Sequence, residues 1–173
     1  EEPGKGRFLN CPIGWGCEQR KNDKIEAYGK ADTFVNFKPG SGAALDAAFV
    51  SAYKKGDPVV GYYWEPTWLM GLYDMVKLEE PACTDDNATA CASPQTEASA
   101  TASAQFVEEA DQVEEFFRNF KTSSAEVSGM LAFLQKTEGA TRDDAAKNFL
   151  KTHEDTWTKW VTPEAAEKIK SSL

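Results

Sequence analysis

Two segments of this sequence carry the side chains with the clearest chemical potential. The segment Val59–Trp68, VVGYYWEPTW, passes from an apolar run into four aromatic rings within seven positions. The segment Cys11–Cys17, CPIGWGC, places one tryptophan between two glycines inside a pair of cysteines. Aromatic faces attract cations, whereas successive backbone N–H groups in a glycine-rich turn can converge on an anion. Both segments are therefore candidates for binding a small charged molecule.

The aromatic segment is expected to follow a strand. Val59 and Val60 come directly after the breaker Asp57-Pro58, and such a short β-branched run is typical of a buried strand. Pro66 ends the strand because proline cannot donate to the sheet ladder. Ligands of open α/β sheets bind just beyond the carboxyl ends of strands, so we expect a crevice lined by Tyr62, Tyr63, Trp64 and Trp68. The alternative is that these rings are core residues, or that Trp68 begins a packed helix.

The four cysteines fall as two close pairs, Cys11 with Cys17 and Cys83 with Cys91. Neither pair has the Cys-x-x-Cys spacing of a zinc or thioredoxin-like centre, so two local disulfides are the simplest interpretation. Disulfides indicate an oxidising compartment, the periplasm or the cell exterior. Other pairings and four free buried cysteines remain open alternatives.

A disulfide between Cys11 and Cys17 would close a small loop and stabilise the fold by only about 2 kcal/mol on the chain-entropy model. Its greater use would be to fix Trp15 and the neighbouring amides. If a helix begins at Glu18, the loop also lies at a helix N-terminus, which favours a carboxylate. The alternative is a stapled surface turn with a buried tryptophan.

Composition excludes several classes of function. The chain has 173 residues, 41% of them hydrophobic, and a formal charge of -9, which opposes binding to nucleic acid or to an anionic membrane. It contains no apolar run of about 20 residues, no signal-peptide core, no Walker loop and no metal-ligand cluster. His153 is expected to be a packed or surface histidine, and Glu65 has no partner carboxylate at a recognisable spacing. We therefore predict neither an enzyme nor a cofactor or metal site.

The first half of the chain predicts an α/β fold. A short strand is expected to end at Phe8 and Leu9, followed by a helix from Glu18 to about Tyr28 and a strand over Ala31–Phe37. A helix over Ser41–Lys55, with Ser41 as its N-cap, then leads to the strand at Val59. Strand, helix and strand in this order indicate a parallel sheet.

The second half is expected to be mostly helical. The segment 69–76 could be helix or strand, and 79–105, rich in Ala, Ser and Thr, predicts a long connection. We expect an inward stripe of Val107, Ala110, Val113, Phe117 and Phe120 on a helix over Phe106–Phe120. Further helices are predicted from Ser123 or Ser124 to Gly139 (with Val127, Met130, Leu131 and Leu134 inward), from Thr141 through Ala145, Phe149, His153 and Trp157 to Trp160, and from Pro163 to Leu173.

Three motifs, CPIGWGC at 11–17, PGSGAALD at 39–46 and YYWEPTW at 62–68, resemble in order and spacing the glycine betaine and proline betaine binding proteins of ABC transporters. The motifs cover the first 70 or so residues, and Ala145–Val161 resembles the terminal helix of that family. The resemblance implies a periplasmic-binding-protein-like fold of type II, with parts of two α/β lobes and a helical C-terminal region. We place the lobe boundary between residues 61 and 62, giving lobes 1–61 and 62–173.

The resemblance also implies a site and its partners. Family members hold a quaternary ammonium in a box of tryptophans, to which Trp15 and Trp64 correspond, with Tyr63 beside them. Backbone groups matching Gly16 and Cys17 hold the ligand carboxylate. The physics agrees, because a trimethylammonium group has no N–H to donate and amides attract a carboxylate without burying a lysine or arginine. An ABC-transporter permease is the implied partner, and a missing N-terminal half could be a separate chain.

Two other functions are compatible with the sequence. A ligand-sensing extracellular domain could bind the same molecule and signal through a partner without transport. A thiol-disulfide enzyme is a third possibility, which the cysteine spacing disfavours.

Overall fold

The computed structural model describes residues 3–173, apart from the side chains of residues 111 and 112. Backbone contacts divide the chain into two compact units, residues 1–64 with 75–95 and residues 65–74 with 96–173. The lobe boundary predicted between residues 61 and 62 concerns the lobes of the family fold and stays a prediction.

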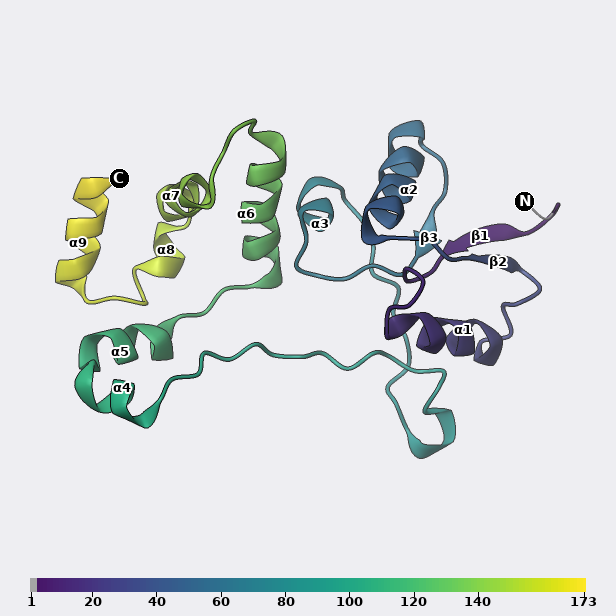
Figure 1. Ribbon diagram of the computed structural model, residues 1–173, viewed down its shortest axis with the longest axis horizontal. Helices are drawn as coiled ribbons and strands as arrows, with labels where there is room; N and C mark the ends of the chain where they lie inside the picture. Colours follow the sequence, from purple (N-terminus) through teal and green to yellow (C-terminus); the bar gives the residue numbers. More distant parts are fainter. Residues whose placement is uncertain (1–2) are drawn as a thin grey trace. The chain divides into compact units, whose positions relative to one another are not determined.

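The first unit is built on a three-stranded parallel sheet, in the order β2-β1-β3 (Figure 1). Strand β1 (Gly6–Leu9) lies in the middle and pairs with β2 (Phe34–Phe37) and with β3 (Val60–Gly61). Helix α1 (Cys17–Ala27) connects β1 to β2, and α2 (Gly42–Lys55) connects β2 to β3. The two crossovers run in opposite directions along the sheet, so right-handed connections place α1 and α2 on opposite faces. The predicted α/β class and parallel pairing are confirmed.

Two strand predictions need correction. The strand expected over Ala31–Phe37 is only Phe34–Phe37, because residues 31–33 form a turn in which Thr33 and Phe34 both donate to the Lys30 carbonyl. The strand expected at Val59 is the two-residue β3, and it is half-buried rather than buried. Its close approach to β1 requires Gly61, since a Cβ there would lie 2.4 Å from the Leu9 carbonyl oxygen.

Helix α2 begins as predicted. The Ser41 side chain accepts a hydrogen bond from the Ala44 N–H, which satisfies one of the free donors of the first turn. Leu45 and Phe49 form its buried face, one turn apart. The helix ends at Gly56, whose φ of 72° is the left-handed conformation that favours glycine. The phase of this helix fixes which residues face the site described below.

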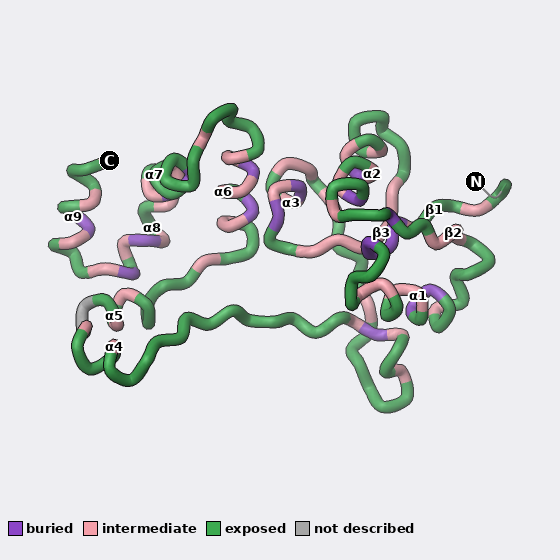
Figure 2. Tube along the Cα trace, viewed as in Figure 1, coloured by how far each residue is buried: buried purple, intermediate pink, exposed green. Residues whose placement is uncertain are grey.

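The predicted long connection is confirmed. Between α3 (Trp68–Leu72) and α4 (Ala104–Glu109) the chain holds only the one-turn helix η1 (Asp85–Asn87), and it is largely exposed (Figure 2). Both predicted disulfides, Cys11–Cys17 and Cys83–Cys91, are present. The Lys24 ammonium pairs with Glu80 at 2.6 Å, which ties the start of the connection to α1.

The second unit is helical in its described residues. Besides α3 and α4 it contains α5 (Asp111–Asn119), α6 (Ser124–Lys136), α7 (Arg142–Thr152), α8 (Glu154–Trp157) and α9 (Pro163–Ser172). Ser123, one of the two predicted starts, and Thr141 each cap a helix, and Thr162 caps the helix predicted to begin at Pro163. Helix α3 packs closely on α6, since a Cβ at Gly71 would lie 2.3 Å from the Ser128 carbonyl oxygen.

Two helices predicted as continuous are broken. The helix over Phe106–Phe120 is interrupted at Ala110 between α4 and α5, and the expected inward residues Val107, Val113, Phe117 and Phe120 are exposed. Phe116 packs on the core, and the ring of Phe120, one turn later, contacts Trp160 with 4.6 Å between the ring centroids. The helix from Thr141 ends at Thr152 and restarts at Glu154. Apolar periodicity continues across both breaks, so the pattern alone does not reveal them.

On α6, the most buried residues are Ser128 and Ala132 rather than the larger side chains that periodicity favours. Small side chains lie there because α3 approaches closely. The core of the unit is centred on Phe149, Trp157, Trp160 and Ala166. Trp157 is 1% exposed and its indole donates a 2.7 Å hydrogen bond to the Leu150 carbonyl, so this tryptophan is structural.

Candidate ligand-binding site

The Cys11–Cys17 loop leaves two backbone donors at the start of α1. The Ile13 N–H donates to Pro39, and the Trp15 N–H donates to Pro12. Among the described residues, the N–H groups of Gly16 and Cys17 have no hydrogen-bond partner. Gly16 is the N-cap of α1 and has no side chain to occupy them. The loop therefore presents two adjacent free amides at the positive end of a helix dipole, which suits a carboxylate.

Glu18 fixes the outer side of this loop. Its carboxylate accepts a 2.9 Å hydrogen bond from the Gly14 N–H and pairs with the Lys38 ammonium at 3.0 Å. These two interactions lower the pKa of Glu18, the amide of Gly14 contributing most. The Gly14 amide is thus occupied by the Glu18 carboxylate and is not open to a ligand. The Lys38 ammonium offsets the negative charge of Glu18, which would otherwise repel an incoming anion.

The structure brings Trp15 and Trp64 together. Their ring centroids are 5.4 Å apart and the planes are inclined by 61°. Trp15 is 40% exposed, and its six-membered ring lies over Gly42 at the start of α2. A cation in the angle between the two planes can lie within about 6 Å of both centroids, which is the range of a cation–π contact. Trp15 is adjacent in sequence to Gly16, so the aromatic corner and the free amides belong to one site.

Tyr63 supports Trp64 from behind. The two rings are near-parallel, with centroids 4.7 Å apart. The Tyr63 hydroxyl donates a 2.6 Å hydrogen bond to Asp46, and its ring packs edge-on against Phe49. Both partners lie on α2, three residues apart on one face. The sequence places Tyr63 in the crevice, and the structure shows its hydroxyl engaged with α2.

The face of the Tyr62 ring is in contact with a lysine of the protein. The Lys21 ammonium lies 5.2 Å from the centre of the Tyr62 ring, which in turn lies 6.0 Å from that of Trp64 at an angle of 23°. Burial raises the pKa of the Tyr62 hydroxyl. Burial is also the main cause that lowers the pKa of Lys21, with the neighbouring Lys24 second. The face of Tyr62 toward Lys21 is therefore occupied.

Trp68, the remaining ring of the predicted crevice, belongs to the second unit. It is the first residue of α3, after the N-cap Thr67, and packs edge-on against Tyr73. The alternative raised by the sequence, that Trp68 begins a helix, is confirmed.

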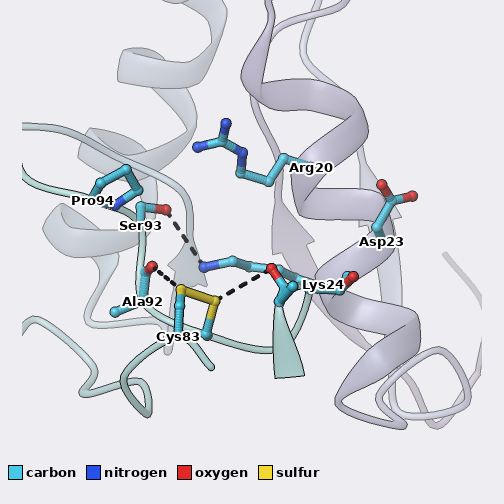
Figure 3. A pocket seen from close by; sticks show the side chains of 10 residues that line it. Arg20, Asp23, Lys24, Cys83, Ala92, Ser93 and Pro94 are labelled. Carbon is cyan, nitrogen blue, oxygen red and sulfur yellow. Dashed lines mark hydrogen bonds between the residues drawn. A yellow bond between two sulfur atoms is a disulfide. The ribbon is translucent and has the colours of Figure 1, made fainter. Parts of the chain in front are cut away.

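A cavity of about 410 Å³ lies on another side of α1, against the loop of the Cys83–Cys91 disulfide (Figure 3). Arg20, Asp23 and Lys24 line it from the helix, and Ser93 and Pro94 from the connection. No aromatic ring lines it, and its buried cation, Lys24, already pairs with Glu80. This cavity does not suit a methylated ammonium.

Within the part of the chain that the structure describes, no three His, Cys, Asp or Glu residues are grouped to hold a metal ion. No described helix has the length and apolarity to cross a bilayer. His153 stacks on Phe149 with the ring planes 9° apart and centroids 4.6 Å apart, which is a packing role.

The model of a known family, the substrate-binding domain of ABC-type glycine betaine transport systems, matches residues 1–152. The chain belongs to this family. The predicted resemblance is thereby confirmed, and the match extends well beyond the three motifs that indicated it.

Individual relatives align with different shares of this chain. The glycine betaine-binding periplasmic protein OusX of Dickeya dadantii is 39% identical over 82 residues, 45% of this chain and 24% of the relative. The glycine betaine/proline betaine-binding periplasmic protein of Escherichia coli is 41% identical over 66 residues, 38% of this chain and 20% of the relative. A trimethylamine N-oxide-binding protein of Pelagibacter ubique is 27% identical over 161 residues, which is 90% of this chain and 50% of the relative.

The solved structure of lactococcal OpuAC, closed and complexed with glycine betaine, superposes on 90% of this chain and 57% of its own, with a TM-score of 0.54 and 20% identity. That similarity confirms the type II binding-protein fold. This family member spans no more than about half the length of these curated relatives.

Several residues that shape the site carried no signal in the sequence. Asp46 reads as an ordinary exposed position of an amphipathic helix, and Lys21 as one of several surface lysines. Both become meaningful only when tertiary packing brings α2 to Tyr63 and α1 to Tyr62. Glu18 alone could have been inferred, because an acid in the first helical turn four residues after a glycine can accept its amide.

Proposed function

We propose that this protein binds a small methylated-amine zwitterion, glycine betaine or a close analogue, outside the cytoplasm for uptake by an ABC transporter. Trp15 and Trp64 hold the methylated ammonium, and the amides of Gly16 and Cys17 hold the carboxylate. Tyr63 acts as the ring against which Trp64 is packed. The observation that carries the proposal is the 5.4 Å Trp15–Trp64 contact directly beside two amides that have no hydrogen-bond partner among the residues the structure describes.

The chemistry of the site fits such a ligand at both ends. A quaternary ammonium spreads its charge over methyl groups and is best held by ring faces, each contributing about 0.5 to 2 kcal/mol. The carboxylate end gains from amides that carry no net charge and cost little to desolvate. The disulfide between Cys11 and Cys17 in this site would persist in an oxidising compartment, in keeping with the periplasmic location of the relatives.

Two indoles enclose only part of a trimethylammonium group. The proposal therefore includes further contacts from polypeptide outside this sequence, in the same or a separate chain, and a permease that receives the loaded protein. We also propose that the two compact units are parts of the two lobes of the family fold.

Trimethylamine N-oxide is the second candidate ligand. The relative named for it aligns with 90% of this chain, against 45% for the OusX relative. It shares the trimethylated nitrogen, and its single oxygen could accept from the same amides. The pair of amides suits the two oxygens of a carboxylate better, which is why we place glycine betaine first.

Calorimetric titration tests the proposal. Glycine betaine and trimethylamine N-oxide are titrated in parallel with 3,3-dimethylbutanoate, in which carbon replaces the quaternary nitrogen. We expect saturable binding of at least one of the two natural ligands and binding at least tenfold weaker for the isostere, which keeps the carboxylate but lacks the positive charge. Equal affinity for the isostere, or no heat and no tryptophan fluorescence change with either natural ligand, contradicts the proposal.

A further inference from the structure

The aromatic corner lies next to a positive charge of the protein. Lys21 extends from α1 to place its ammonium 5.2 Å from the centre of Tyr62, on the stack that continues to Trp64. Together these two distances place the Lys21 ammonium at most 11.2 Å from the centre of the Trp64 ring.

The other basic side chains near the site have carboxylate partners. Lys38 pairs with Glu18 at 3.0 Å, and Lys24 pairs with Glu80 at 2.6 Å. Lys21 forms no ion pair in the described residues: its ammonium contacts the Tyr62 ring and the Ser93 hydroxyl at 3.5 Å, and the Glu80 carboxylate, already paired with Lys24, acts on it only through space. Its charge is thus the least compensated of the three, and partial burial limits how far water can screen it.

We propose that Lys21 makes the site selective for net-neutral zwitterions over quaternary ammonium ions that carry a net positive charge, such as choline. This inference rests on the proposed function and concerns which methylated amines the same site accepts.

The reasoning follows from the charge of each ligand as a whole. The trimethylammonium of either ligand is repelled by Lys21 when it lies against Trp64. In glycine betaine the attached carboxylate, held at Gly16 and Cys17, is attracted by the same lysine and offsets that repulsion. Choline carries a hydroxyl in place of the carboxylate, so nothing offsets it. The chain's formal charge of -9 favours any cation, so a local positive charge adds to the discrimination that the carboxylate contacts at Gly16 and Cys17 provide.

The contact with Tyr62 also explains how the lysine is held in place. Stacking an ammonium on a ring face fixes it without a carboxylate, and a carboxylate partner would cancel the charge. Lys21 therefore occupies the Tyr62 face and leaves Trp15 and Trp64 as the surfaces open to a ligand.

The test is a comparison of glycine betaine and choline dissociation constants for the full chain and three variants at low and physiological ionic strength. Lys21→Gln removes the charge, and Lys21→Arg keeps both the charge and the ring contact. Lys54→Gln removes one charge from the far end of α2, about 18 Å along the helix from Gly42. It controls for the change in net charge.

We expect Lys21→Gln to shift the affinity ratio about threefold toward choline at low salt, with the shift shrinking at physiological salt because ions screen it. Lys21→Arg and Lys54→Gln should retain the wild-type ratio. An unchanged ratio in Lys21→Gln, or an equal shift in Lys54→Gln, overturns the inference while leaving the proposed function intact. If the wild type binds no methylated amine, the proposed function fails and this inference fails with it.

Discussion

The Tyr63 hydroxyl donates a 2.6 Å hydrogen bond to Asp46, and the ring that carries it stacks on Trp64. The Asp46 carboxylate on α2 therefore positions the Tyr63 ring, and through it the Trp64 ring that, in our proposal, contacts the ligand. The backbone after β3 has no regular structure to hold Trp64, so the orientation of this indole depends on side-chain contacts.

Removing this hydrogen bond should weaken ligand binding, although neither Tyr63 nor Asp46 contacts the ligand in our proposal. Tyr63→Phe keeps the ring and loses the donor, and we expect a loss of about 1 kcal/mol in stability and a severalfold loss of affinity. Asp46→Asn keeps an acceptor and should have the smaller effect. Thermal unfolding and titration with glycine betaine measure the two quantities. An affinity unaltered in Tyr63→Phe would show that Trp64 is held by other contacts.

The two disulfides should differ in their effect on binding. Replacing Cys11 and Cys17 together by serine frees the loop that presents the Gly16 and Cys17 amides, so we expect a loss of affinity and about 2 kcal/mol of stability. Replacing Cys83 and Cys91 changes a loop that contains no proposed ligand contact, and affinity should remain within twofold. Titration of both double variants, after a check of their circular dichroism, decides the matter. Equal losses in the two variants would contradict the assignment of the carboxylate to the first loop.

The contribution of Glu18 should depend on pH. Hydrogen bonding from Gly14 and the ammonium of Lys38 lower its pKa in the folded state, so the folded protein binds this proton more weakly than the unfolded chain. The stabilisation is therefore present above the ordinary glutamate pKa of about 4.3 and is lost as pH falls through the lower folded value. Glu18→Gln should unfold with a shallower pH dependence in this acidic range. Urea unfolding between pH 3 and 6 tests it, and parallel curves for variant and wild type would refute it.

Much of the site could be predicted because its residues are close in sequence. The CPIGWGC motif contains Trp15 and the amides of Gly16 and Cys17 within a loop that one disulfide closes, so the local geometry of the candidate site could be predicted from the motif. Parallel pairing of β1 with β3 then brings the carboxyl ends of the strands together, which is why Trp64 meets Trp15 across 48 intervening positions.

What could not be predicted depends on packing between elements. The breaks at Ala110 and His153 lie within continuous apolar patterns, and at His153 the helices on both sides contribute to the same core through Phe149 and Trp157. The small residues Gly71 and Ser128 reflect the close approach of α3 and α6, which no periodicity encodes. Trp68 matched the aromatic motif, yet the chain passes into the second unit just before it.

Two glycines of the second unit should respond oppositely to alanine. At Gly71 a Cβ would lie 2.3 Å from the Ser128 carbonyl oxygen, so Gly71→Ala should force α3 and α6 apart and cost about 1 to 3 kcal/mol. At Gly129, inside α6, a Cβ meets nothing within 4 Å, and Gly129→Ala should stabilise by up to about 1 kcal/mol. Chemical denaturation measures both. Stabilisation by Gly71→Ala would contradict the close packing of these helices.

The central claim is that the faces of Trp15 and Trp64 bind a methylated ammonium. The most direct measurement is calorimetric titration of glycine betaine into the wild type, Trp15→Ala, Trp64→Ala and Trp15→Phe, with Trp68→Phe as a control indole in the other unit. Each alanine variant should lose at least tenfold in affinity, Trp15→Phe should lose less because a smaller ring face remains, and Trp68→Phe should stay within threefold of the wild type. Wild-type affinity in folded Trp15→Ala or Trp64→Ala would contradict the account.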